Sequence, residues 1–215
     1  MSLFLFDIDG TLITGLGDYE SALEEAIWTE FQKKVKVSLE GLHGLTDKAI
    51  LRETLKRNNI NVKEDSVSRC LFYFGEIYTA SKEKTKLLPD VEETLEQLRN
   101  RGDFLALVTG NATQFARKRL ALYDLNKYLP SGAFGEESYE RADLVAFAVS
   151  RAETRGWKKD LNDVYVVGDT IHDIRGGKRA GTRSVGVLTG KATTKDFQKE
   201  GADYIIKDLA GLLTL

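Results

Sequence analysis

An apolar run at Leu3 to Phe6 is followed at once by two carboxylates, in the stretch LFLFDIDGTLI. Four consecutive apolar residues are typical of a strand that is buried on both faces. Asp7 and Asp9 then stand where further core residues are expected, although a buried carboxylate must be paired, neutralised or bound to a cation. The pattern predicts a core strand that ends at an edge where such a cation can lie.

Four further apolar segments continue the pattern. They are FLALVTGN at 104–111, DVYVVGDT at 163–170, RSVGVLTG at 183–190 and ADYIIKDL at 202–209. Between them apolar residues recur at the three- and four-residue spacing of helices. Strands that alternate with helices indicate βαβ crossovers and a parallel sheet. We therefore predict an α/β fold with a Rossmann-like parallel sheet core.

The alternation is interrupted by a stretch with helical patterns only. Residues 19–31 and 67–78 place apolar side chains on one helical face, and this pattern makes Cys70 a core residue. We predict an inserted all-helical cap domain at 15–84, with a catalytic core formed by 1–14 and 85–215.

Composition excludes several classes of partner. The 215 residues carry 31 basic and 33 acidic side chains, a net charge of −2, so no basic field attracts nucleic acid or an anionic membrane. The densest basic run, 117–119, is predicted to be a solvated helix face. The single cysteine fits a reducing compartment, and the apolar start is too short for a signal peptide or a membrane span. We expect a cytoplasmic protein.

Three predicted strands end in residues that suggest chemistry. These are Asp7 and Asp9, the sequence Thr109-Gly110-Asn111, and Asp169. Ligands of open parallel sheets bind beyond the carboxyl ends of the strands, so neighbouring strands would bring these ends to one site. Carboxylate oxygens together with a substrate phosphate suit Mg²⁺.

The two acids of the first strand suit phosphoryl transfer. Side chains at i and i+2 share one face of a strand, so one carboxylate could attack phosphorus while the other transfers protons. Thr109 offers a hydroxyl, and Gly110 and Asn111 offer backbone N–H groups for a phosphate. Taken alone, the segment that contains Asp7 and Asp9 would more often be only a turn, and so would Thr109-Gly110-Asn111.

Two other acids are placed at expected helix starts. Asp90 and Glu93 predict a capping box after Pro89. Asp173, four residues after Asp169, is either a helix cap or a group that supports the metal ligands.

The motifs DIDGT at 7–11 and GDTIHD at 168–173, together with the Thr109 strand end, resemble those of the haloacid dehalogenase superfamily. The similarity is to its phosphatase branch with a helical cap, which includes phosphoglycolate phosphatases, and it covers nearly the whole chain. It implies a Mg²⁺-dependent hydrolysis of a small phosphate monoester.

The resemblance also implies roles for individual residues. Asp7 would be the nucleophile that forms an aspartyl-phosphate, and Asp9 the general acid/base. Mg²⁺ would be held by the Asp7 carboxylate, the Asp9 backbone carbonyl and Asp169. Thr109 and the Gly110 amide would hold the phosphoryl group.

One departure from the family pattern concerns a lysine that usually precedes the third motif. No lysine occurs between Lys127 and Lys158, and Arg141 stands at about the expected place. A guanidinium could supply the same charge in a bidentate manner. The alternative is a surface arginine paired with Glu137 or Asp143.

Other functions share these features. A phosphomutase acting on a sugar phosphate is the closest alternative, followed by a receiver-type signalling protein or a non-catalytic phosphate-binding protein. The expected partner is a small phosphorylated metabolite, with no nucleic acid and no membrane, and the expected state is a monomer or homodimer. The polar, glycine-rich loop at 41–47 is predicted to contact substrate, with His43 as a ligand.

Overall fold

The computed structural model describes residues 1–158 and 160–215, and its centre is a six-stranded sheet in which every neighbouring pair is parallel. The strand order is β5-β4-β1-β6-β7-β8. The strands are β1 (Leu3–Phe6), β4 (Phe104–Val108), β5 (Gly132–Ala133), β6 (Val164–Gly168), β7 (Arg183–Val187) and β8 (Tyr204–Ile206). The predicted α/β fold with a Rossmann-like parallel sheet is confirmed, and among the six described strands of this sheet the two-residue β5 was not anticipated.

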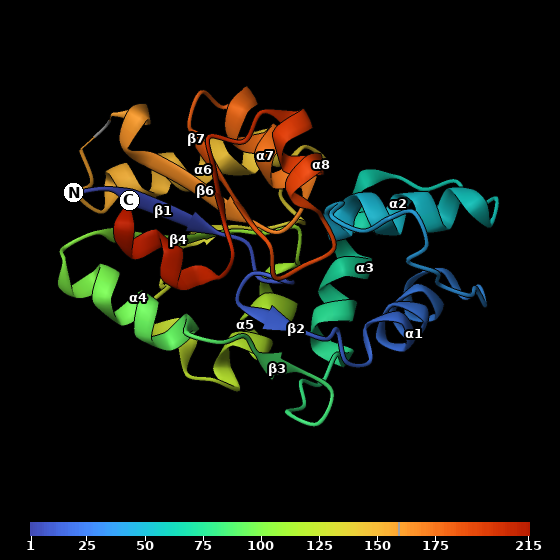
Figure 1. Cartoon of the computed structure of the whole chain (residues 1–215). Helices are drawn as coiled ribbons and strands as arrows, with labels where there is room; N and C mark the ends of the chain where they lie inside the picture. The colour runs from blue at the N-terminus through green and yellow to red at the C-terminus, as the bar shows by residue number, and fades with distance from the viewer. Residues whose placement is uncertain (159) are drawn as a thin grey trace.

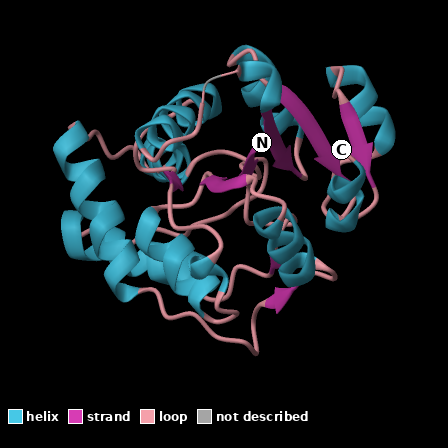
Figure 2. Cartoon of the chain, turned by 90° about the vertical axis from the view of Figure 1, so that its left-hand side faces the viewer, coloured by secondary structure: helices cyan, strands magenta, loops and turns pink. Residues whose placement is uncertain are grey.

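Helices cover both faces of this sheet, as Figure 2 shows. The core helices are α4 (Val91–Asn100), α5 (Thr113–Ala121), α6 (Arg141–Thr154), α7 (Ile171–Arg179) and α8 (Thr194–Glu200), with short 3₁₀ turns at Leu125–Lys127, Leu161–Asp163 and Leu209–Thr214. Alternate residues of β1 point to opposite faces: Leu3 and Leu5 pack in the cluster that contains α6, and Phe4 and Phe6 in the cluster that contains α4. This double burial explains the unbroken apolar run of the sequence.

Three helices form the inserted segment: α1 (Tyr19–Phe31), α2 (Asp47–Arg57) and α3 (Glu64–Ile77). They lie together at one end of the molecule (Figure 1) and share an apolar cluster in which Cys70 is buried, as predicted. A short antiparallel pair, β2 (Ile13–Thr14) with β3 (Lys86–Leu87), brings the two connections to this segment together. The division into a cap at 15–84 and a two-part core stays a prediction.

The helices also test two smaller points. None of those in the described part of the chain is long and apolar enough to cross a membrane. The capping box predicted at α4 is wrong: Asp90 has a left-handed backbone, with φ at 59°, and its side chain makes no cap hydrogen bond. Capping side chains depend on an extended backbone at the N-cap residue, which Asp90 does not adopt.

Candidate active site

The strand ends singled out in the sequence meet at one edge of the sheet. β1 lies between β4 and β6, and Phe6 is in register with both Leu107 and Val167. The backbone N–H of Asp7 donates to the carbonyl of Val167 at 2.9 Å, so the first residue after β1 is fixed by its neighbour. Parallel strands in register end side by side, and this places the polar residues that follow them around a common space.

Three carboxylates gather there. Oxygen atoms of Asp7, Asp169 and Asp173 all lie within 4.8 Å of one another, and all three side chains are buried. Burial raises the pKa of Asp7 to about 7, although the Arg141 charge acts in the opposite direction. Burial raises the pKa of Asp169 to about 8, and the neighbouring carboxylates of Asp173, Asp7 and Asp9 add to the effect. The cluster therefore holds negative charge at considerable cost.

Two glycines let the backbone close tightly on Asp169. A Cβ on Gly10, which has φ at +72°, would lie 2.4 Å from Asp169 Oδ2, and one on Gly190 would lie 1.7 Å from the same atom. Thr189 adds a hydrogen bond of 2.5 Å from its hydroxyl to the Gly10 carbonyl. The loop after β7 is thus part of the site, and the sequence analysis did not include it.

Asp173 takes part in the helix cap, although it is not the N-cap residue itself, and its support of the metal ligands stays a prediction. The N-cap of α7 is Thr170, and Asp173 completes a capping box three residues later by accepting from the Thr170 N–H and hydroxyl. Its other oxygen, Oδ1, faces the cluster, 3.3 Å from Arg141 Nη2. Capping therefore fixes the direction in which this carboxylate points.

Arg141 is the cation of the cluster. It is the first residue of α6 and is 8% exposed, with Nη1 3.4 Å from Asp7 Oδ1 and Nη2 3.3 Å from Asp173 Oδ1. The alternative of a surface pair with Glu137 or Asp143 is excluded, since Glu137 pairs with Arg151 and Asp143 accepts from Ser138. The side chain also donates to the carbonyls of Val108 and Gly44.

The donor set fits a hard divalent cation. When all three carboxylates are ionised, one guanidinium leaves two negative charges unbalanced, and Asp169 Oδ1 accepts no hydrogen bond from the described part of the chain. Unsatisfied buried oxygen atoms are costly, and oxygen ligands with carboxylate charge are those that Mg²⁺ prefers.

Asp9 lies outside this cluster and has partners of its own. Its Oδ2 accepts from Asn111 Nδ2 at 2.7 Å, and its Oδ1 lies 2.6 Å from Arg119 Nη2. Arg119 also donates to Asn111 Oδ1 and to the carbonyl of Gly15, both at 2.9 Å. One guanidinium thus joins the predicted acid/base, the loop after β4 and the start of the inserted segment.

The prediction that 117–119 is a solvated helix face is therefore wrong. Arg119 is fully buried, with its guanidinium 4.9 Å from the centre of the Phe115 ring. Lys118 donates to three carbonyls at the end of α3, and Arg117 to Asn126 and the Leu129 carbonyl. A helix that packs between two layers has no solvated face, a fact that periodicity alone could not supply.

The loop that follows β4, Thr109-Gly110-Asn111-Ala112, is held from the side of α2. The Asp47 N–H donates to the Gly110 carbonyl at 2.7 Å, and its carboxylate accepts from the Ala112 N–H at 2.6 Å and the Tyr19 hydroxyl at 2.8 Å. Burial raises the pKa of Asp47 to about 7. Thr109 is fully buried, and its hydroxyl accepts from the Asn111 N–H at 3.2 Å.

A cavity of about 420 Å³ opens above these groups. Among its lining residues are Asp7, Asp9, Gly110, Asn111, Arg141 and Asp169 from the core, and Tyr19, Leu42, His43 and Asp47 from the inserted segment. The loop at 41–47 thus reaches the site, as its composition suggested, and the core loop at 189–191 lines the cavity as well.

Comparison with known proteins agrees with this geometry. Residues 4–187 match the family model described as haloacid dehalogenase-like hydrolase. The chain belongs to this family. The predicted family is confirmed, and with it the prediction of a hydrolase.

Individual relatives cover most of the chain. Phosphoglycolate phosphatase of Aquifex aeolicus is 27% identical over 88% of this chain and 86% of its own length. That of Vibrio parahaemolyticus is 26% identical over 99% of this chain and 95% of its own. The crystal structure of a hydrolase from Pseudomonas syringae shares the fold, with a TM-score of 0.74, 21% identity, and coverage of 100% and 97% of the two chains.

The raised pKa values predict how stability depends on pH without a metal. The folded state keeps protons on Asp7 and Asp169 that the unfolded chain releases near its ordinary value of 3.8. This contribution is complete below that value and is lost as pH rises through about 7 to 8, so the melting temperature in chelator should fall from about pH 6 to about pH 8. Added Mg²⁺ should raise it more at the higher pH.

Asp169→Asn provides the control for this experiment. In this variant the melting temperature should fall less between about pH 6 and about pH 8, and added Mg²⁺ should raise it less. The pKa of His172, which burial lowers, has the opposite effect on stability, but the residue is present in both proteins. A melting temperature whose pH dependence is the same in the two proteins would contradict the assignment.

The Arg119–Asp9 pair predicts a measurable coupling. Arg119→Met should lower the free energy of unfolding by about 3 kcal/mol, the lower end for removing one partner of a buried pair, because Asp9 is 30% exposed. Asp9→Asn should lower the free energy of unfolding less in the Arg119→Met background than in the parent. Urea unfolding of the parent, the two single variants and the double variant measures this coupling. The exposed Arg179–Glu140 pair is the control, since Arg179→Met should change stability by less than about 1 kcal/mol.

Proposed function

We propose that the chain hydrolyses a small phosphate monoester by passing its phosphoryl group through Asp7. The observation that carries this proposal is the position of Asp7, buried beside Asp169, Asp173 and Arg141 at the floor of the cavity. Its backbone is fixed at the end of the central strand, and a nucleophile held in place needs little reorganisation. The predicted class of enzyme, a phosphoric monoester hydrolase, is confirmed by the family and by its phosphatase relatives.

The metal in this proposal is Mg²⁺. The carboxylates of Asp7 and Asp169 would hold it with the Asp9 backbone carbonyl, and Asp173 lies close enough to support them. When bound, the ion would neutralise charge on the phosphoryl oxygens.

The chain's own groups would carry two displacements. In the first, an Asp7 carboxylate oxygen bonds to phosphorus, the bond to the leaving oxygen breaks, and Asp9 gives that oxygen a proton. In the second, Asp9 takes a proton from water, the water oxygen bonds to phosphorus, and phosphate leaves Asp7. Arg141 would hold charge beside Asp7, while Arg119 and Asn111 keep Asp9 in place at the cavity wall.

The roles of the two acids are tested with p-nitrophenyl phosphate in Mg²⁺, by the release of inorganic phosphate. Asp7→Asn should abolish turnover, because its replacement cannot attack phosphorus. Asp9→Asn should lower the rate by roughly 10²–10⁴-fold, the usual contribution of a positioned acid/base. EDTA should stop the reaction. Phosphate release also separates a phosphatase from the phosphomutase alternative, which would retain the phosphoryl group on an organic product.

Asp163→Asn is the control for these variants, because this exposed acid lies on the 3₁₀ turn before β6 and away from the cavity. It should keep the parent rate. Near-normal turnover of Asp7→Asn would remove the basis of the proposed function.

Arg141 is expected to supply the charge that the family usually takes from a lysine. Arg141→Ala should cost on the order of 2–5 kcal/mol in kcat/KM, as for a desolvated charge partner. Arg141→Lys should recover only part of this, because one ammonium replaces a fork that reaches both Asp7 and Asp173. Steady-state kinetics measures the difference, and a parent-like rate for Arg141→Ala would assign the charge to another residue.

The substrate in this proposal is a small phosphorylated metabolite, and the relatives named phosphoglycolate phosphatases support this class of substrate. The cytoplasmic location and the monomeric or dimeric state stay predictions.

A further inference from the structure

Two side chains meet across the mouth of the cavity. Lys191 Nζ lies 3.0 Å from His43 Nε2, and both residues line the cavity and are exposed. Lys191 belongs to the core loop between β7 and α8, which faces the inserted segment in Figure 1, and His43 belongs to the loop before α2. An ammonium only donates, so His43 accepts through Nε2 in this contact.

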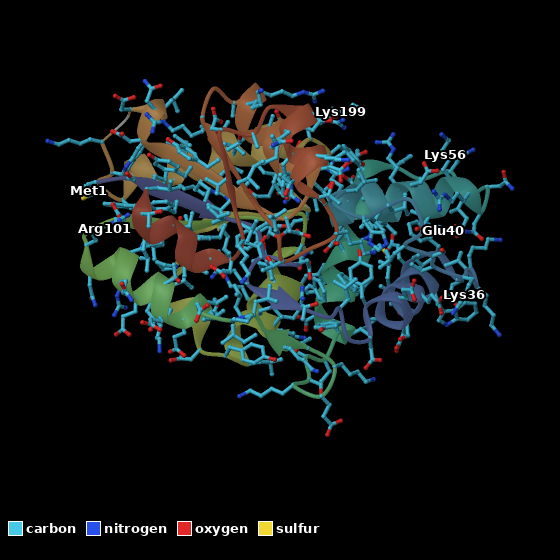
Figure 3. The ribbon with its side chains drawn as sticks, viewed as in Figure 1. Met1, Lys36, Glu40, Lys56, Arg101 and Lys199 are labelled. Atoms are coloured by element: carbon cyan, nitrogen blue, oxygen red, sulfur yellow. The ribbon has the colours of Figure 1, made fainter. Side chains whose placement is uncertain are left out.

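The positive charge of Lys191 is not balanced by any neighbouring carboxylate that the structure describes. Within the described part of the chain it has no carboxylate partner, and its contact with His43 occupies one of three N–H donors. The other cation that lines the cavity, Arg141, is already paired with Asp7 and Asp173. No lysine of the inserted segment is among the described residues that line the cavity, and Lys36 and Lys56 extend from the outer surface of that segment, as Figure 3 shows.

The space between this lysine and the carboxylates is large and partly apolar. Apolar side chains of the inserted segment form one wall: Leu16, Leu39, Leu42, Leu45 and Ile50. The cavity of about 420 Å³ corresponds to the volume of about 14 water molecules at roughly 30 Å³ each. A leaving group of two carbons would leave most of this wall in contact with water, so the wall favours a larger apolar body.

We propose that the leaving group of the substrate has an apolar body ending in a carboxylate, and that Lys191 binds this carboxylate. The inference rests on the proposed function, because it concerns the part of the ester that departs. One ammonium balances one negative charge, and the acids that line the cavity, Asp7, Asp9, Asp47 and Asp169, disfavour a more highly charged group. His43 is a positioning residue that keeps Lys191 at the mouth.

A matched pair of esters tests the proposal. 4-Carboxyphenyl phosphate and 4-carbamoylphenyl phosphate have the same shape and differ in the charge of the group opposite the phosphate. The parent should prefer the carboxylate in kcat/KM. Lys191→Met should reduce this preference on the order of tenfold, as for the loss of a hydrogen bond to a charged group. Lys191→Arg should keep most of it.

Two further variants separate binding from general effects. Lys195→Met removes an exposed lysine on α8 that does not line the cavity, and it should leave the preference unchanged. His43→Leu should reduce the preference less than Lys191→Met, mainly through KM. A preference that is absent in the parent, or unchanged in Lys191→Met, would overturn the proposal.

The design also distinguishes failure of the inference from failure of the proposed function. Turnover of p-nitrophenyl phosphate and of both esters without preference would leave a phosphatase and reject the carboxylate site. If the parent hydrolyses no ester, the proposed function is wrong. Calorimetric binding of the two esters to the parent and to Lys191→Met then tests the carboxylate site at Lys191. Equal affinities of the parent for the two esters reject this site. A preference of the parent for the carboxylate ester that is lost in Lys191→Met supports it.

Discussion

The cost of holding carboxylates together at the end of a buried sheet governs the arrangement of this protein. Asp7, Asp169 and Asp173 repel one another in a place where water does not screen them. Two features of the fold reduce this repulsion. Arg141, at the start of α6, places a positive charge beside Asp7 and Asp173, and the capping box turns one Asp173 oxygen away from the cluster. The charge that remains matches a divalent ion, so an arrangement unfavourable for stability suits the binding of a cation and a phosphate.

A second set of buried polar contacts joins the inserted segment to this chemistry. Asp47 holds the loop after β4 through the Gly110 carbonyl and the Ala112 N–H, and Arg119 holds both Asp9 and the Gly15 carbonyl. Removal of one partner from such a contact would leave the other buried and unpaired, which costs more than the contact gains. A displacement of the inserted segment would therefore disturb the proposed acid/base, Asp9, and the loop after β4 together.

These contacts also explain which residues sequence analysis missed. Arg119 lies in a basic run, and charged residues are mostly exposed, so the pattern favoured a solvated face. It is buried because α5 packs between the sheet and α3, with Phe115 among the aromatic side chains of the inserted segment. Asp47 was included only as the last residue of the polar loop at 41–47. Lys191 follows a strand whose end carried no acid and drew no attention.

The sequence by itself determined the parallel sheet, the inserted helices and the order of the acidic strand ends, because apolar periodicity and local motifs are properties of neighbouring residues. It also placed Arg141 near the position of the expected cation. Only the tertiary structure decided its partners, the pairing of Asp9 with Arg119 and the meeting of Lys191 with His43. Each of these joins residues far apart in the chain, and burial and charge balance between such residues depend on packing that no local pattern records.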